Sequence, residues 1–170
     1  MNPFFISLLL VLFSATPLHA ADPADEKRLD EVAERGTHVM PFDLEKTTHV
    51  FSKTADGGIQ QVIAKDKSDA EQIQLIRDHL SEISEEFRQG DFSKPAQIHG
   101  GDMPGLAELK TANPDQIKIE YRVLPEGAQI NYSTKFPQLI RAIHQWFDAQ
   151  LSDHERHAVH GHSHQHMHQQ

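Results

Sequence analysis

The segment Ser68 to Gly90 decides the fold, and its sequence is SDAEQIQLIRDHLSEISEEFRQG. Its apolar residues recur at steps of three and four, which is typical of an amphipathic helix. They are Ile73, Ile76, Leu80, Ile83 and Phe87. Ser68 with Glu71 matches a capping box at the start, and Gly90 is a typical stop. A helix with one long apolar stripe needs an apolar surface to cover it, so the segment predicts a helix packed on a sheet.

Two predicted hairpins flank this helix and supply the sheet. Residues 46–65 alternate between two faces around the turn Ala55-Asp56-Gly57-Gly58. Residues 117–132 alternate in the same way around Pro125-Glu126-Gly127. We therefore expect these four strands to form one antiparallel sheet.

A second amphipathic helix follows the last strand and begins near Ser133 or Thr134. Its apolar side consists of Leu139, Ile140, Ala142, Ile143, Trp146, Phe147 and Leu151. The predicted fold is therefore α+β, a single small domain in which two main helices pack on the sheet in the order ββαββα. Residues 91–114 connect the two halves and are predicted to hold one short helix at residues 106–110. A connection of this length in a compact domain is often functional.

The N-terminus has the pattern of a secretory signal. The apolar run from Phe4 to Phe13 is too short to span a bilayer, and the small residues Ala20 and Ala21 suit a cleavage site. Because no Lys or Arg precedes the run, an uncleaved N-terminal anchor is the alternative. With the signal removed, we expect a periplasmic or secreted protein that makes no contact with the membrane.

The predicted organisation has four parts. After the signal at residues 1–20 comes an N-terminal helical segment at residues 21–37, where Asp22 caps a short helix that stops at Gly36. This helix has little to bury, so we expect it on the surface or partly frayed. The α+β domain covers residues 38–155, and a flexible histidine-rich tail covers residues 156–170.

Composition limits the partners and the chemistry. The formal net charge is −9, and residues 1–20 carry no charged side chain, so the exported part is acidic. This argues against binding to nucleic acid or to anionic lipid. Cysteine is absent, which excludes disulfides, thiolate ligands and a cysteine nucleophile. The chain also lacks the sequence motifs of serine hydrolases, zinc proteases, P-loop enzymes and dinucleotide-binding proteins.

The histidine-rich tail is the most specific functional signal. Its candidate metal ligands are His157, His160, His162, His164, His166, Met167 and His168. Neutral imidazoles bind copper, zinc and nickel, and a flexible segment rich in them captures such ions. We predict copper or zinc as the bound ion, with nickel as a further candidate. The alternative is a polar tail without a role.

A second group of candidate ligands lies in the domain and consists of His99, Met103, His144, Asp148 and His154. Two glycines after His99 allow a sharp turn that would bring Met103 back toward it. A thioether beside an imidazole favours copper, and His38 with Met40 is another such pair. The alternatives are a loop in which Asp102 caps a helix, and simple packing of the methionines.

Helical spacing suggests further pairs. His144 and Asp148 are four residues apart, as are Asp153 and His157, so each pair would share a helix face. A surface ion pair or a packed histidine is the alternative for each. The test is whether five histidines of the domain converge in space: His49, His79, His99, His144 and His154.

Several strings in the domain resemble a family of small bacterial proteins. They are FDLEKTTHVF at 42–51, GGIQ at 57–60, FRQGD at 87–91, HGGDMPG at 99–105 and AIHQWFDAQ at 142–150. This family carries the label aspartate carbamoyltransferase, which implies that carbamoyl phosphate binds through a Ser-Thr-Arg-Thr loop. The nearest string here, Ser133-Thr134-Lys135, lacks the arginine and the second threonine, and the chain is shorter than that enzyme.

The leading hypothesis from sequence is an exported protein that binds or buffers copper or zinc, with the tail capturing ions. One rival is an envelope scaffold domain that binds a protein partner and whose histidines are incidental. A second rival is an enzyme with the activity that the family label implies.

Overall fold

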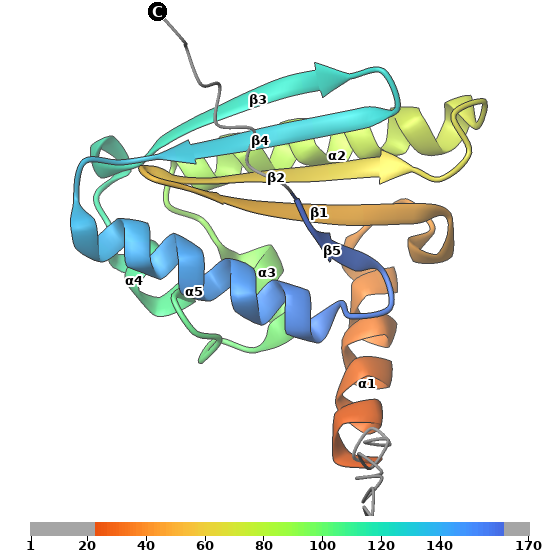
Figure 1. The fold of residues 1–170 in the computed structure, drawn as a ribbon, viewed down its shortest axis with the longest axis horizontal. Coiled ribbons are helices and arrows are strands. Elements are labelled where there is room, and N and C mark those ends of the chain that lie inside the picture. The colour runs from red at the N-terminus through yellow and green to blue at the C-terminus, as the bar shows by residue number, and fades with distance from the viewer. Residues whose placement is uncertain (1–22, 162–170) are drawn as a thin grey trace, which may run out of the picture.

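The computed structural model describes residues 23–161. They form a single α+β domain, as predicted, in which a five-stranded sheet is covered by helices (Figure 1). Helices α2 (Ala70–Arg88) and α5 (Pro137–Asp153) pack on the sheet, α2 mainly against β3 and β4 and α5 against β1 and β2. Within residues 23–161, no helix has the length and apolar character needed to cross a membrane.

The two predicted hairpins form the centre of the sheet. Strand β1 (Thr47–Thr54) pairs with β2 (Gly57–Ala64), and β3 (Lys118–Leu124) pairs with β4 (Gly127–Ser133), both antiparallel. Strands β2 and β4 join the hairpins, which gives the order β3-β4-β2-β1-β5.

The fifth strand corrects the prediction of a purely antiparallel sheet. Strand β5 (Ala158–His160) runs parallel to β1, with Ala158 opposite His49, so the sheet is mixed. Its residues fall within the segment that the sequence assigned to the tail. A strand of three residues has too few side chains to show an alternating pattern, which explains why it was missed.

Helix α2 buries the apolar stripe predicted for it, from Ile73 to Phe87. Its N-cap is Asp69, whose side chain accepts a hydrogen bond from the backbone N–H of Gln72. The predicted capping box at Ser68 is wrong, because the Ser68 hydroxyl instead donates to Asp66.

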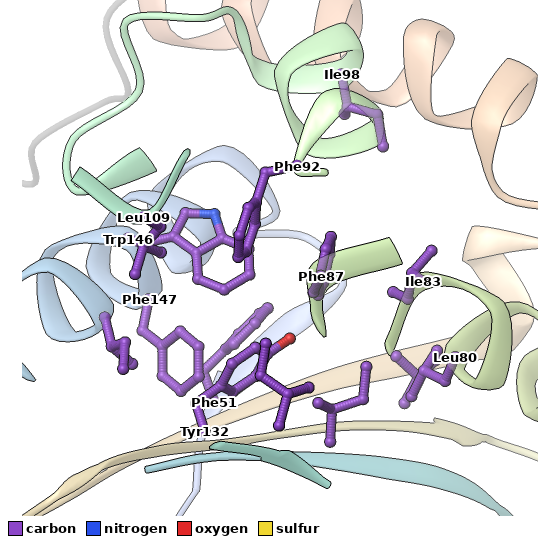
Figure 2. Close-up of a cluster of buried hydrophobic side chains, with 14 of the residues drawn as sticks. Phe51, Leu80, Ile83, Phe87, Phe92, Ile98, Leu109, Tyr132, Trp146 and Phe147 are labelled. Atoms are coloured by element: carbon purple, nitrogen blue, oxygen red, sulfur yellow. The ribbon is translucent and has the colours of Figure 1, made fainter. Parts of the chain in front are cut away.

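An aromatic core fills the space between α2, α5 and the sheet (Figure 2). Trp146 of α5 makes edge contacts with Phe87, Phe92 and Tyr132, and the rings of Phe87 and Phe92 stack with centroids 4.5 Å apart. Helix α5 begins at Pro137, later than predicted, because the Thr134 hydroxyl donates to the backbone of Gln116 and accepts from the N–H of Phe136.

The connection between the two halves is largely helical. It contains the predicted α4 (Leu106–Thr111) and also α3 (Ser93–His99), which the sequence did not predict. Two short 3₁₀ helices, η1 (Leu44–Lys46) and η2 (Pro114–Gln116), precede β1 and β3.

The N-terminal helix is docked on the domain and runs past its expected stop. Helix α1 (Pro23–Val39) continues through Gly36, and Val32 is fully buried. Two of its arginines bind carbonyl oxygens at the end of α3: Arg28 donates to that of His99 at 2.8 Å and Arg35 to that of Ile98 at 2.6 Å. These contacts hold α1 against α3.

Candidate functional site

A cavity of about 40 Å³ lies between the sheet and the helices α2, α3 and α5. We call it the histidine cavity, because His49, His79, His99 and His154 all line it. All four histidines are buried. This volume is enough for an ion or a few water molecules.

Regular spacing within each element places these side chains. On α5, Gln150 and His154 follow Trp146 at steps of four, so all three project from one helix face. On β1, His49 and Phe51 are two apart and share the face turned to the helices. Each of these two elements therefore contributes a histidine to the cavity.

Three of the four rings are close together. The ring centroids of His49 and His154 are 5.1 Å apart, and those of His99 and His154 are 4.8 Å apart. We call these three residues the histidine trio. The ring of Phe42 contacts both His49 and His79, with centroids 5.9 and 5.6 Å away.

His99 is oriented by a carboxylate. Its Nδ1 lies 2.8 Å from Oδ2 of Asp153. Oδ2 also accepts from a terminal nitrogen of Arg28 at 2.7 Å, and Oδ1 accepts from Nε of Arg28 at 3.1 Å. Burial disfavours the charge of Asp153, but these bonds from His99 and Arg28 outweigh it and lower the pKa of Asp153 to about 2. Since an ionised carboxylate only accepts, Nδ1 of His99 carries the proton and Nε2 keeps its lone pair.

Burial keeps the histidines neutral. It lowers the pKa of His49 to about 3, with a smaller effect from nearby His157, and it lowers the pKa of His79 to about 4. Burial likewise places the pKa of His154 well below 6.5, and that of His99 below its usual value despite the hydrogen bond to Asp153. At neutral pH each ring therefore offers a lone pair, which is the form that ligates metals.

Some buried ring nitrogens lack a partner. Among residues 23–161, these atoms include Nδ1 of His49, Nδ1 of His157 and Nε1 of Trp146. A buried polar atom without a hydrogen bond costs stability, so a protein that retains one usually has a water molecule, an ion or a function at that place.

The sequence-predicted ligands in the domain divide into two groups. His99 and His154 line the histidine cavity, whereas Met103, His144 and Asp148 do not. Nε2 of His144 lies 3.0 Å from the carbonyl oxygen of Thr54 and 2.9 Å from that of Gly57, so it holds the turn between β1 and β2. Asp148 forms an ion pair with Lys53, and Met103 is buried in the core.

His157 and Asp153 do not share a helix face, because α5 ends at Asp153. His157 instead lies beside the trio. Its carbonyl oxygen accepts from the backbone N–H of His49 at 2.8 Å, and its Nε2 is 3.3 Å from the carboxylate of Glu45. His160 is exposed on β5, and the predicted ligands from His162 to His168 lie outside the described residues.

The sequence underestimated two residues of this site. Met40 lines the histidine cavity without His38, although the sequence pairs it with His38 and offers simple packing as the alternative. Asp153 orients His99 from 54 positions away, and no local pattern reveals such a pair. The burial of His49 could be inferred from the sequence, because it shares a strand face with Phe51.

The string Ser133-Thr134-Lys135 lies at the end of β4, where the Thr134 hydroxyl is taken up by backbone hydrogen bonds. It does not line the histidine cavity. In comparisons with known proteins, no family model, no curated protein and no solved structure matches this chain.

Proposed function

We propose that this protein binds a transition metal ion, copper or zinc, at the histidine trio of its domain. The observation that carries the proposal is the convergence of three buried, neutral imidazoles from β1, α3 and the end of α5, one of them oriented by a carboxylate. A carboxylate bound to the far nitrogen of a ligating histidine is the usual outer shell of a protein metal site.

The spacing of the rings supports this proposal. Imidazole nitrogens bind zinc at about 2.0–2.1 Å, which places the ring centres of two histidines on one tetrahedral ion roughly 5 Å apart. Two separations in the trio, from His154 to His49 and from His154 to His99, are 5.1 and 4.8 Å. His154 therefore lies at a suitable spacing to share an ion with either of the other two rings.

Binding includes a rotation of side chains. No three or more histidine, aspartate or glutamate side chains in the part of the chain from residue 23 to 161 are already arranged to hold an ion. The ring of His154 stands at 87° to that of His99, and His154 is the C-cap residue, where α5 gives way to the turn before β5. Rotamer changes at binding sites are common, so we assign the rotation to His154.

The proposed setting is the periplasm or the exterior of the cell. There, the signal-like residues 1–20 have been removed, and the acidic surface attracts cations. The histidine-rich segment collects ions, and the trio holds one of them more selectively. No cysteine is needed for this chemistry, because imidazoles supply the ligands.

Titration calorimetry tests the proposal. Copper and zinc are titrated into the purified protein and into its His99→Gln, His154→Gln and His38→Gln variants, of which the last is a control at an exposed position. The tail is the same in all four proteins, so the difference between variants isolates the trio. We expect His99→Gln and His154→Gln to lose one bound ion, whereas His38→Gln binds like the wild type.

Identical isotherms for all four proteins would contradict the proposal. Any bound copper or zinc would then be assigned to the tail. Circular dichroism in the presence of a chelator checks that each variant is folded before titration. A protein that binds neither ion also contradicts the proposal.

A further inference from the structure

One buried methionine lines the same cavity as the histidine trio. Met40 lines the histidine cavity together with the three rings and is buried. Its backbone N–H donates to the carbonyl of Gly36 at 2.8 Å, which ties it to the last turn of α1. A Cβ at position 36 would lie only 2.7 Å from Cε of Met40, so the glycine makes room for the methionine methyl group.

The charges around the cavity form a second observation. Among residues 23–161, no aspartate or glutamate lines it, and the one cationic residue that does, Lys94, is paired with Glu82 at 2.8 Å and Glu86 at 2.9 Å. The negative charge of Asp153 is matched by Arg28. The cavity therefore offers a buried set of neutral ligands.

A neutral, buried ligand set favours an ion of low charge. The free energy needed to move an ion out of water rises with the square of its charge. In a site without a carboxylate ligand, this desolvation is far more unfavourable for a divalent ion than for a monovalent one. Thioether sulfur is a soft ligand that selects Cu(I), whereas Zn(II) sites are built from imidazole, thiolate and carboxylate.

We infer that Met40 supplies a thioether ligand beside the histidine trio and that this ligand makes the site selective for Cu(I) over Zn(II). The inference rests on the proposed function and names its ion. Cu(I) then has three imidazoles and one thioether, and no group in the site needs to lose a proton.

Two buried methionines provide a matched pair of variants. Met40→Leu removes the thioether at the cavity and conserves the volume, and Met103→Leu makes the same change in the core, away from the cavity. Cu(I) affinity is measured without oxygen by competition with bathocuproine disulfonate, and Zn(II) affinity by competition with a chromophoric chelator. Both measurements use the full-length tail, so its contribution cancels between variants.

We expect Met40→Leu to weaken Cu(I) binding and to leave Zn(II) binding unchanged. Loss of a direct ligand should cost at least the roughly 10- to 100-fold that loss of an outer-shell partner costs. Met103→Leu should bind both ions like the wild type. If Met40→Leu binds Cu(I) like the wild type while His99→Gln does not, the inference is wrong and the proposed function stands. If His99→Gln also binds like the wild type, both fail.

A spectroscopic measurement keeps the inference testable if Met40→Leu does not fold. Met167→Leu removes the sulfur of the tail, and this variant is loaded with one equivalent of Cu(I). Its X-ray absorption spectrum should show a sulfur neighbour of the copper. A first shell of nitrogen and oxygen alone overturns the inference.

Discussion

Asp153 connects two parts of the protein that are distant in sequence. Its carboxylate accepts from Nδ1 of His99 and from two nitrogens of the Arg28 guanidinium, so one residue orients the histidine and anchors α1. Helix α1 in turn ends beside Met40 at the cavity. The orientation of His99 and the docking of α1 therefore depend on the same carboxylate.

Replacing Asp153 by asparagine should weaken metal binding. The variant loses the charge that orients His99 and holds Arg28, and loss of such an outer-shell partner typically costs roughly 10- to 100-fold in metal affinity. Asp148→Asn is the matched control, since Asp148 lies on the same helix and pairs with Lys53 away from the cavity. Calorimetry with the preferred ion measures both. Equal losses in the two variants would show that charge on α5, rather than the contact with His99, matters.

The metal-free protein should lose stability as the pH falls through the range in which free imidazoles titrate. In the unfolded chain these groups have a pKa of about 6.5. Burial lowers the pKa of His49 to about 3 and that of His79 to about 4, so between these values and 6.5 the unfolded chain binds protons that the folded chain does not. The stabilisation is complete above about pH 7 and is lost as the pH decreases, by up to about 1.4 kcal/mol per pH unit for each group.

Urea unfolding in the presence of a chelator measures this dependence from about pH 7.5 down to about pH 5. His79→Gln should have a flatter pH profile than the wild type, because it removes one of the titrating groups. His38→Gln, at an exposed position, should keep the wild-type profile. A free energy of unfolding that is constant over this range would contradict burial of the neutral rings.

At the residue scale, two of the sequence candidates, His99 and His154, lie at the histidine cavity. Their role as metal ligands stays a prediction. The contact of Asp153 with His99 and the place of Met40 at the cavity were not predicted, since both arise only through packing of α1, α3 and α5. Helical spacing paired Asp153 with His157, which is wrong because the helix ends before His157.

At the scale of elements, the contact between β2 and α5 is unusually close. Gly58 of β2 lies directly under the ring of Phe147, and any Cβ at this position would overlap that ring. The rings of Phe51 and Tyr132 hold Phe147 from the neighbouring strands, with centroids 5.1 and 5.8 Å away. The glycine thus sets the distance at which α5, and with it His154, lies over the sheet.

Gly58→Ala should therefore destabilise the protein by about 1–3 kcal/mol, the usual cost of overpacking a core. Gly101→Ala is the control, because a Cβ there meets nothing within 4 Å, and its effect should stay within about 0.5 kcal/mol. Chemical denaturation measures both. A neutral Gly58→Ala variant would mean that α5 moves freely away from the sheet.

Elements with long patterns could be predicted from the sequence, and short ones could not. The stripe of α2 extends over Ala70–Arg88, so its periodicity was unambiguous. Helix α3 has only seven residues, with Pro95 among them, and it is stable through contacts with α1 rather than through its own pattern. The few apolar residues of helix α1 predict a position on the surface. Its arginines instead dock it by hydrogen bonds to carbonyl groups, and such contacts leave no apolar pattern in the sequence.

For the whole molecule, an ion that binds at the trio must stabilise the fold. These ligands are brought together only by folding, whereas tail histidines remain available in the unfolded chain and so contribute little to stability. At a free ion concentration of about 100 times the dissociation constant, the gain is about 2.7 kcal/mol. For a domain of this size we expect the melting temperature to rise by roughly 5–10 °C.

Differential scanning fluorimetry with copper or zinc measures the rise, and a chelator should reverse it. Magnesium is the control ion, because it prefers oxygen ligands and none of the described residues that line the cavity carries a carboxylate. Ion binding without any change in melting temperature would place the bound ion on the tail.

The order of the strands also determines how the sheet ends. One edge is β5, which has only three residues, and the other is β3, where the exposed side chains Lys118, Glu120 and Arg122 alternate in charge. Short or charged edges are poor templates for a further strand from another molecule. Both ends of the sheet therefore disfavour edge-to-edge growth into fibrils.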